Sequence, residues 1–279
     1  MAEYLTKTEH LKAVADAIRA KGGTSAPLAY PSGFVSAIQA IHSGGSDDVL
    51  NSIIDRSIAG KYENNTVESI GSNAFDSCEK LTTITIGAVK SLGKYAFNNC
   101  FNLTTVNAPE VTSIDSSAFY YCYRLSTIFA PKTTVIKALA FTACSNLQKA
   151  EFPVLKTIEG RAFSSAGLKS VNYPLITSIP YSTFERCDSL IKADFTNVTS
   201  IGSSAFKKDT ALETIILRGS SVATLASGAF SETPIASGTG YIYVPAALVD
   251  SYKAATNWAT YANQIRAIED YPDITGGAA

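Results

Sequence analysis

The stretch SLGKYAFNNCFNLTTVNA, Ser91–Ala108, decides the fold because the chain repeats its pattern. The stretch SIDSSAFYYCYRLSTIFA, Ser113–Ala130, has Ala-Phe, Cys and Leu at the same places 22 residues later. The Ala-Phe pair occurs seven times, and Thr183-Phe184 is a variant of it. The phenylalanine spacings along the chain are 22, 22, 22, 22, 21, 22 and 24. A nearly fixed period of this length predicts a solenoid in which each repeat forms one coil.

Alignment of the repeats on this phenylalanine gives columns of equivalent residues. Apolar residues stand five and eight positions before it, with Thr133 as the one polar exception. A leucine or isoleucine five or six positions after it opens the pattern L-x-x-h-x-h, where h is apolar, as in Leu103, Val106 and Ala108. This alternation with a period of two predicts a short strand with one buried face.

We therefore predict a repeat solenoid, a leucine-rich-repeat-like right-handed coil of about eight 22-residue repeats with short parallel strands. Each phenylalanine should fill the centre of its coil, and the A-F-x-x-C segment should form a short helical turn. One coil cannot bury its apolar side alone, so neighbouring coils must stack to form a continuous core.

Cysteine stands three positions after the phenylalanine in five repeats, at Cys78, Cys100, Cys122, Cys144 and Cys187. Side chains of one column point the same way, whereas a disulfide needs converging Cβ atoms. Metal-binding spacings such as C-x-x-C do not occur. We expect buried free thiols that pack as small apolar groups, and no metal or cofactor.

Composition and motifs narrow the class of protein. The chain has 279 residues and a net charge of −1, without the basic excess of nucleic-acid-binding proteins. No apolar run reaches the ~18 residues of a membrane span, and the N-terminus has no hydrophobic signal region, so we expect no export. His10 and His42 lack a nearby nucleophile pattern, and no G-x-S-x-G, H-E-x-x-H or Walker motif occurs. We expect no enzymatic activity.

The segments outside the repeats have their own signals. Thr6 and Glu9 can cap a helix, Gly22-Gly23 can end it, and Pro31 can begin a second helix. The apolar residues assigned to assembly are Leu11, Val14, Ile18, Phe34 and Ile38. The predicted order is a helical docking or oligomerisation module at 1–42, a Gly/Ser linker at 43–46, an N-terminal cap at 47–66, the solenoid at 67–236, a C-terminal strand-helix cap at 237–271 and a flexible tail at 272–279.

Two interpretations of the N-terminal helices stay open. A hairpin of this size is too small to be stable alone, so it packs either on the end of the solenoid or on a partner. The glycine-rich linker favours a tethered docking module.

The repeat resembles a known family. The coil I-x-x-x-A-F-x-x-C-x-x-L-x-x-h-x-h is similar to the BspA-type leucine-rich repeats of bacterial surface proteins over about residues 60–271. The ending Tyr241–Pro245, followed by Tyr252 and Trp258, resembles the usual terminus of that family. Residues 11–21 and 30–34 are similar to N-terminal segments of tail proteins in phages and prophages of Gram-positive gut bacteria. The family implies no catalytic residues.

The candidate binding residues lie beside the central residue of each strand, where the analogy with leucine-rich repeats places them outward. Ile216 belongs to the same outward column. Phe129 could stack on a sugar face, although a solvated strand surface rich in threonine would show a similar pattern. The aromatic residues near Arg124 form a plausible hot spot or pack between coils. The candidates are Thr105, Asn107, Thr127, Phe129, Lys149, Glu151, Tyr121, Tyr123 and Arg124.

Three functions fit these resemblances. In the first, a phage tail or tail-fibre protein docks on other tail proteins or on itself through the N-terminus, with a homotrimer as one arrangement. Its solenoid then binds a host cell-surface protein or glycan, and the protein is located in the virion tail. The second is an adhesin on the bacterial cell surface, and the third is a purely structural tail spacer. None of them involves nucleic acid or a membrane span.

Overall fold

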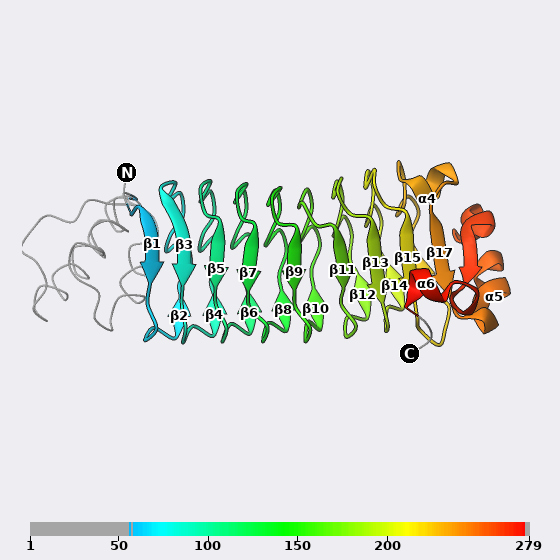
Figure 1. The fold of residues 1–279 in the computed structure, drawn as a ribbon, viewed down its shortest axis with the longest axis horizontal. Helices are drawn as coiled ribbons and strands as arrows, with labels where there is room; N and C mark the ends of the chain where they lie inside the picture. Colours follow the sequence, from blue (N-terminus) through cyan, green and yellow to red (C-terminus); the bar gives the residue numbers. More distant parts are fainter. Residues whose placement is uncertain (1–55, 57, 277–279) are drawn as a thin grey trace, which may run out of the picture.

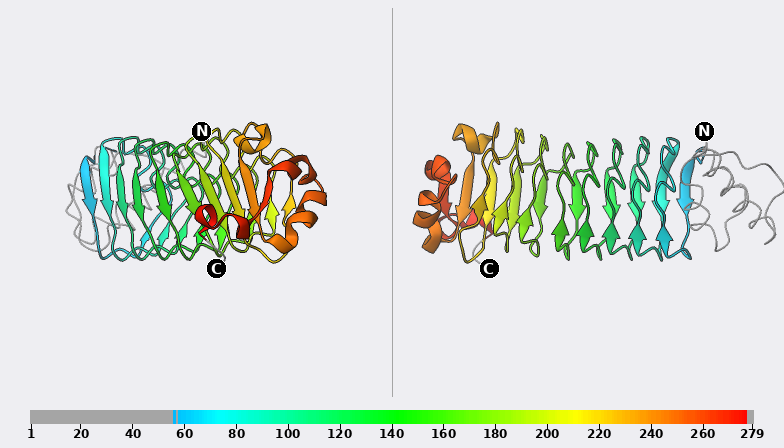
Figure 2. Two further views of the ribbon diagram at one scale, coloured as in Figure 1. Left: turned by 45° about the vertical axis from the view of Figure 1, so that its right-hand side comes forward. Right: turned by 180° about the vertical axis from the view of Figure 1, so that it is seen from behind.

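A computed structural model describes residue 56 and residues 58–276 of the chain. These residues form a parallel β-solenoid of about 9 turns, closed at one end by short helices (Figure 1). The predicted module at 1–42, including Leu11, Val14, Ile18, Phe34 and Ile38, and the linker at 43–46 lie outside the described residues. The two views of Figure 2 show the coils stacked along one axis.

Each regular coil contributes one longer strand and one two-residue strand. The longer strands are β1 Gly60–Glu63, β3 Leu81–Thr85, β5 Thr105–Asn107, β7 Thr127–Phe129, β9 Lys149–Glu151, β11 Ser170–Asn172, β13 Lys192–Phe195, β15 Thr214–Leu217, β17 Tyr241–Val244 and β18 Ile265–Ala267. The shorter strands are β2 Ser69–Ile70, β4 Ser91–Leu92, β6 Ser113–Ile114, β8 Val135–Ile136, β10 Thr157–Ile158, β12 Ser178–Ile179, β14 Ser200–Ile201 and β16 Thr224–Leu225. Neighbouring strands pair in parallel, and in the regular coils the paired residues lie one repeat apart, as in Thr105↔Thr127 and Thr127↔Lys149.

The repeated phenylalanines form the centre of the core, as the sequence predicts. All eight rings are fully buried. Successive rings are nearly parallel, and most centroids lie 5.0 to 5.5 Å apart, as between Phe75 and Phe97 and between Phe206 and Phe230. The stack therefore runs through the eight repeats and forms part of one continuous core.

The segment around Ala-Phe is a tight turn rather than the predicted helical turn. Residues two before and two after the phenylalanine have positive φ, as at Tyr95 (58°) and Asn99 (57°). Between them the N–H of Phe97 donates to the carbonyl of Ala118 in the next coil at 2.7 Å. In a helix this N–H would donate to a carbonyl of the same segment. Here it donates to the next coil, and this hydrogen bonding between coils is why the segment is not helical.

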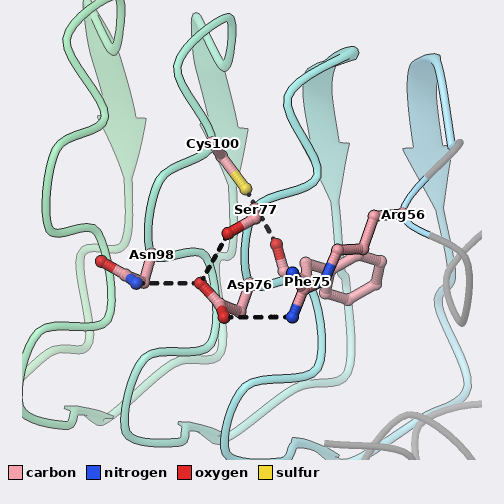
Figure 3. Close-up of polar contacts among 6 residues, drawn as sticks. All are labelled: Arg56, Phe75, Asp76, Ser77, Asn98 and Cys100. Atoms are coloured by element: carbon pink, nitrogen blue, oxygen red, sulfur yellow. Dashed lines mark hydrogen bonds and ion pairs between the residues drawn. The ribbon is translucent and has the colours of Figure 1, made fainter. Parts of the chain in front are cut away.

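The cysteine column confirms the prediction of buried free thiols. Cys100 Sγ donates to the carbonyl of Phe75 in the preceding coil at 3.0 Å (Figure 3), and Cys122, Cys144 and Cys187 make the equivalent contact. Burial raises the pKa of Cys100 and its equivalents above that of an ordinary thiol. The thiols therefore join coils by hydrogen bonds as well as filling space.

Serine and threonine side chains form further ladders between coils. Thr104 Oγ1 donates to Thr82 O at 2.9 Å, and Ser126 Oγ donates to Thr104 O at 3.0 Å. The polar exception Thr133 is fully buried and donates to Val111 O at 3.0 Å. Much of the serine and threonine content is therefore structural, because these short side chains satisfy backbone carbonyls of the neighbouring coil.

The C-terminal cap extends further than expected. The sequence predicts a cap of one strand followed by a helix, but a second strand, β18, pairs with β17 in parallel. The helices of this end are α4 Pro234–Ser237, η1 Ala246–Leu248, α5 Val249–Ala254, η2 Ala259–Gln264, η3 Ile268–Asp270 and α6 Pro272–Thr275. Trp258 is fully buried, and its Nε1 donates to Ala223 O at 2.6 Å. We expected a flexible tail from residue 272, whereas residues 272–275 form α6, where the carbonyl of Ile274 accepts from Lys192 Nζ at 2.6 Å.

Candidate ligand-binding surface

The structure brings six of the predicted site residues together on the outer face of the longer strands. Thr105, Thr127 and Lys149 are consecutive partners across β5, β7 and β9. Asn107, Phe129 and Glu151 form the second row in the same way. Phe129 is 54% exposed although it is a large apolar residue. These six residues define the outer patch.

Charges on the outer patch are paired. Lys149 Nζ lies 2.8 Å from Glu151 Oε1, and both side chains are well exposed. An exposed pair of this kind adds little stability. It does leave the patch without a net charge, because Thr105, Asn107, Thr127 and Phe129 are neutral.

The sheet that carries the outer patch ends at β9. The longer strands form one sheet from β1 to β9 and a second from β11 to β18, and the shorter strands are divided between β10 and β12. The Phe163 and Phe184 centroids are 5.8 Å apart, the largest spacing in the phenylalanine stack. Both sheets are therefore interrupted at this junction, whereas the turns stay hydrogen-bonded across it, as from Phe163 N to Thr183 O at 2.9 Å.

The interruption coincides with a repeat that is one residue shorter than those before it. Phe163 and Leu168 are separated by five positions, whereas each of the preceding repeats has six between the same two columns. The shortened turn passes close beneath the preceding coil, so that a Cβ at Gly167 would collide with the backbone carbonyl of Ser145. Only glycine can follow this path without displacing that carbonyl.

A tyrosine hydroxyl joins the two sides of the interruption. Tyr173, at the end of β11, is fully buried, and its hydroxyl donates to Ala150 O in β9 at 3.1 Å. Burial raises the pKa of Tyr173 far above that of an ordinary tyrosine, so the hydroxyl remains a donor. This contact satisfies a carbonyl at the junction of the two sheets.

A groove of about 540 Å³ opens at the interruption. Phe129, Lys149 and Glu151 of the outer patch form one side of it, and Ser170 and Asn172 of β11 form the other. Prolines that follow the strands line the end of the groove, at Pro131, Pro153 and Pro174. Sequence reasoning places Ser170 and Asn172 in the outward column without selecting them as candidate binding residues, and it missed these prolines. The spacing of 21 residues between Phe163 and Phe184 was the available signal.

The outer face beyond the groove is occupied by the chain itself. Asp194 on β13 accepts two hydrogen bonds from Arg218, from Nε at 2.9 Å and from Nη2 at 2.8 Å. The expectation that Ile216 is exposed is wrong, because Ile216 is fully buried against Tyr243 and Ile268. Figure 1 shows α6 folded back beside β15 and β17. Among the described residues, the face therefore stays open on the strands before the groove and at β11.

The predicted aromatic cluster lies apart from the groove. Tyr121 and Tyr123 are 36% and 43% exposed, and their rings stack with centroids 5.5 Å apart. Tyr123 also stacks on Phe101 of the preceding coil at 5.6 Å, and Arg124 beside it is exposed. The cluster precedes β7, whereas Phe129 is the last residue of that strand. The ring contact with Phe101 shows packing between coils, and the exposed fractions show that both tyrosines also remain partly accessible.

The described part of the chain contains no group of three or more His, Cys, Asp or Glu side chains placed to hold a metal ion. None of its helices combines the length and apolar character of a membrane span.

The fold and the repeat together define a leucine-rich-repeat solenoid. Residues 61–154 and 134–240 match the family described as BspA type Leucine rich repeat region, with 6 copies. The chain belongs to this family. A search of curated proteins found no match.

Several solved structures resemble the chain. A T. pallidum leucine-rich-repeat protein has 25% identity and a TM-score of 0.49, over 52% of this chain and 72% of that one. A leucine-rich cell surface protein of Faecalibacterium prausnitzii has 19% identity and a TM-score of 0.35, over 75% and 78% of the two chains. The pneumococcal vaccine antigen PcpA has 13% identity and a TM-score of 0.32, over 74% and 41%. These TM-scores are too low for us to infer function from the likeness.

Proposed function

We propose that the chain is a bacterial surface-interaction protein of the adhesin type, which binds an extracellular ligand through the outer patch on β5, β7 and β9. The observation that carries the proposal is the exposure of Phe129 in the middle of the outer patch. The other residues of the patch are polar, and its two charges form an ion pair. An exposed aromatic side chain offers a large apolar area for contact, and aromatic residues are enriched in protein interfaces. Membership of the BspA-type family supports a location at the bacterial cell surface.

The geometry supports binding rather than catalysis. Repeat solenoids present extended surfaces to their partners, and the outer patch is a row of side chains on adjacent coils. Its one ion pair is exposed on both sides. Electrostatic catalysis relies on groups held away from bulk water, whereas this pair is open to solvent.

The hypothesis of a phage tail protein has less support. It depends on similarity within residues 1–42, which lie outside the described residues, and the family match covers only the repeats. We therefore retain the surface-interaction hypothesis.

Binding to host cells tests the proposal. Thr127 lies in the middle of the outer patch and is exposed, so Thr127→Arg places a long charged side chain between the neighbouring strands. We expect purified Thr127→Arg to bind cultured epithelial cells about tenfold less than the natural chain, as for a residue at the centre of an interface.

The matched control is Thr157→Arg, at an exposed position of the short strand β10. It should bind cells as well as the natural chain. Equal binding by all three proteins, or loss of binding with Thr157→Arg alone, would contradict the proposal.

A further inference from the structure

Phe129 is an apolar residue in a column that otherwise carries polar side chains on the open face. Its register partners are Asn107 and Glu151. The other large apolar residue of that column, Ile216, is fully buried because Tyr243 and Ile268 cover it. In the described part of the chain Phe129 has no such cover and is 54% exposed. Its exposed ring lines the groove.

The rest of the groove is polar but carries no net charge. Glu151 contributes carboxylate oxygens, Asn172 an amide and Ser170 a hydroxyl. Lys149 is the one cation among the lining residues, and Glu151 neutralises it at 2.8 Å. An anionic or cationic ligand would therefore find no unpaired opposite charge, whereas donors and acceptors are abundant.

We infer that the groove at the interruption between β9 and β11 binds an uncharged oligosaccharide, with one sugar ring stacked on Phe129 and its hydroxyls hydrogen-bonded to Glu151, Asn172 and Ser170. A pyranose ring has an apolar C–H face and a rim of hydroxyls, which matches one aromatic platform among neutral or paired polar groups. The inference rests on the proposed function and names its ligand class.

The size and the end of the groove favour a sugar over a peptide strand. Its volume of about 540 Å³ lies within the roughly 300–1,000 Å³ typical of small-molecule sites. A peptide that extends a sheet needs a row of free backbone N–H and C=O groups. Three lining residues, Pro131, Pro153 and Pro174, have no N–H to offer.

The experiment is a binding screen of the full chain on an array of neutral linear oligosaccharides, namely α- and β-glucans, mannans and galactans, with sialylated and sulfated glycans alongside. Titration calorimetry then measures the affinity of the best neutral glycan. We expect Phe129→Ala to weaken that affinity at least about tenfold, Phe129→Trp to preserve it, and Asn172→Ala to weaken it by a similar factor. The affinity should change little with salt, because the paired charges attract no ion.

The matched control is Tyr181→Ala, which removes a ring that is 53% exposed and does not line the groove. It should leave glycan affinity unchanged. Two results would overturn the inference: no neutral glycan binds, or a neutral glycan binds equally to Phe129→Ala.

The assay on epithelial cells separates this inference from the proposed function. Cell binding that is lost with Thr127→Arg but unaffected by Phe129→Ala would refute the glycan inference and leave the outer patch as a binding surface. A preference for sulfated or sialylated glycans would also refute it, since the groove would then select charge.

Discussion

Asp209 offers the sharpest test of how the coils are stacked. It occupies the cysteine column, three positions after Phe206, and is fully buried. Its Oδ1 accepts from Cys187 N at 2.8 Å, whereas Oδ2 has no hydrogen-bond partner among the described residues. Burial raises the pKa of Asp209 to about 10; the Cys187 hydrogen bond opposes this effect, and Asp188 and Glu185 reinforce it. The carboxyl is therefore protonated in the folded chain near neutral pH.

The raised pKa makes Asp209 destabilising as the pH rises. In the unfolded chain an aspartate loses its proton above about pH 4, whereas the folded chain retains it up to about pH 10. Between these values each pH unit lowers the free energy of unfolding by about 1.4 kcal/mol. Neutral pH lies about three units above the pKa of an aspartate in the unfolded chain. Asp209 therefore lowers the free energy of unfolding by about 4 kcal/mol at neutral pH, relative to acidic pH.

Two substitutions isolate this effect. Asp209→Asn preserves the shape and cannot ionise, and Asp209→Cys introduces the residue that the preceding coil has at this position, Cys187. We expect the stability of each variant, relative to the natural chain, to rise by about 1.4 kcal/mol per pH unit between about pH 5 and pH 8. Urea unfolding followed by circular dichroism measures this difference at each pH, and the other titrating groups cancel. A difference that does not change with pH would refute a buried, protonated Asp209.

Further expected outcomes concern the interruption and the thiols. Gly167→Ala should lower the free energy of unfolding in urea by roughly 2–4 kcal/mol, because the added Cβ collides with Ser145 O. Gly219→Ala is the control. The atoms nearest to a Cβ at Gly219 are 3.7 Å away, so this variant should change the free energy of unfolding by under about 0.5 kcal/mol. Equal effects would contradict the close approach at Gly167. Tyr173→Phe should lower the free energy of unfolding by roughly 1–3 kcal/mol in the same assay, because the carbonyl of Ala150 loses its hydrogen-bond donor. An unchanged urea midpoint would argue against that hydrogen bond. The five buried thiols should resist a thiol-labelling reagent in the native chain and react in urea, and rapid native labelling would contradict their burial.

The regular coils could be predicted from sequence because every repeat obeys the same spacing. The Ala-Phe pairs predict the stacked rings, and the cysteine column predicts the buried thiols, because equivalent residues of a solenoid occupy equivalent places in successive coils. The same rule placed Thr105, Thr127 and Lys149 on one face, which the strand register confirms.

The differences arise where the chain departs from the repeat. The groove lies where one residue is missing before Leu168, and a column alignment records such a gap without showing that the sheet is interrupted there. Ile216 is covered by Tyr243 and Ile268 from the C-terminal end, a contact across distant parts of the chain that no local pattern predicts. The positive φ at residues such as Tyr95 is imposed by bonds between coils, since tyrosine has no preference for it.

The central claim is that the open face around Phe129 contacts the ligand. Hydroxyl-radical footprinting of the chain, free and bound to epithelial cells, tests it directly, because Phe129 and Tyr181 are 54% and 53% exposed and serve as probe and control. We predict that cell binding protects Phe129 from oxidation and leaves Tyr181 as reactive as in the free chain. Undiminished oxidation of Phe129 on bound protein would contradict the claim.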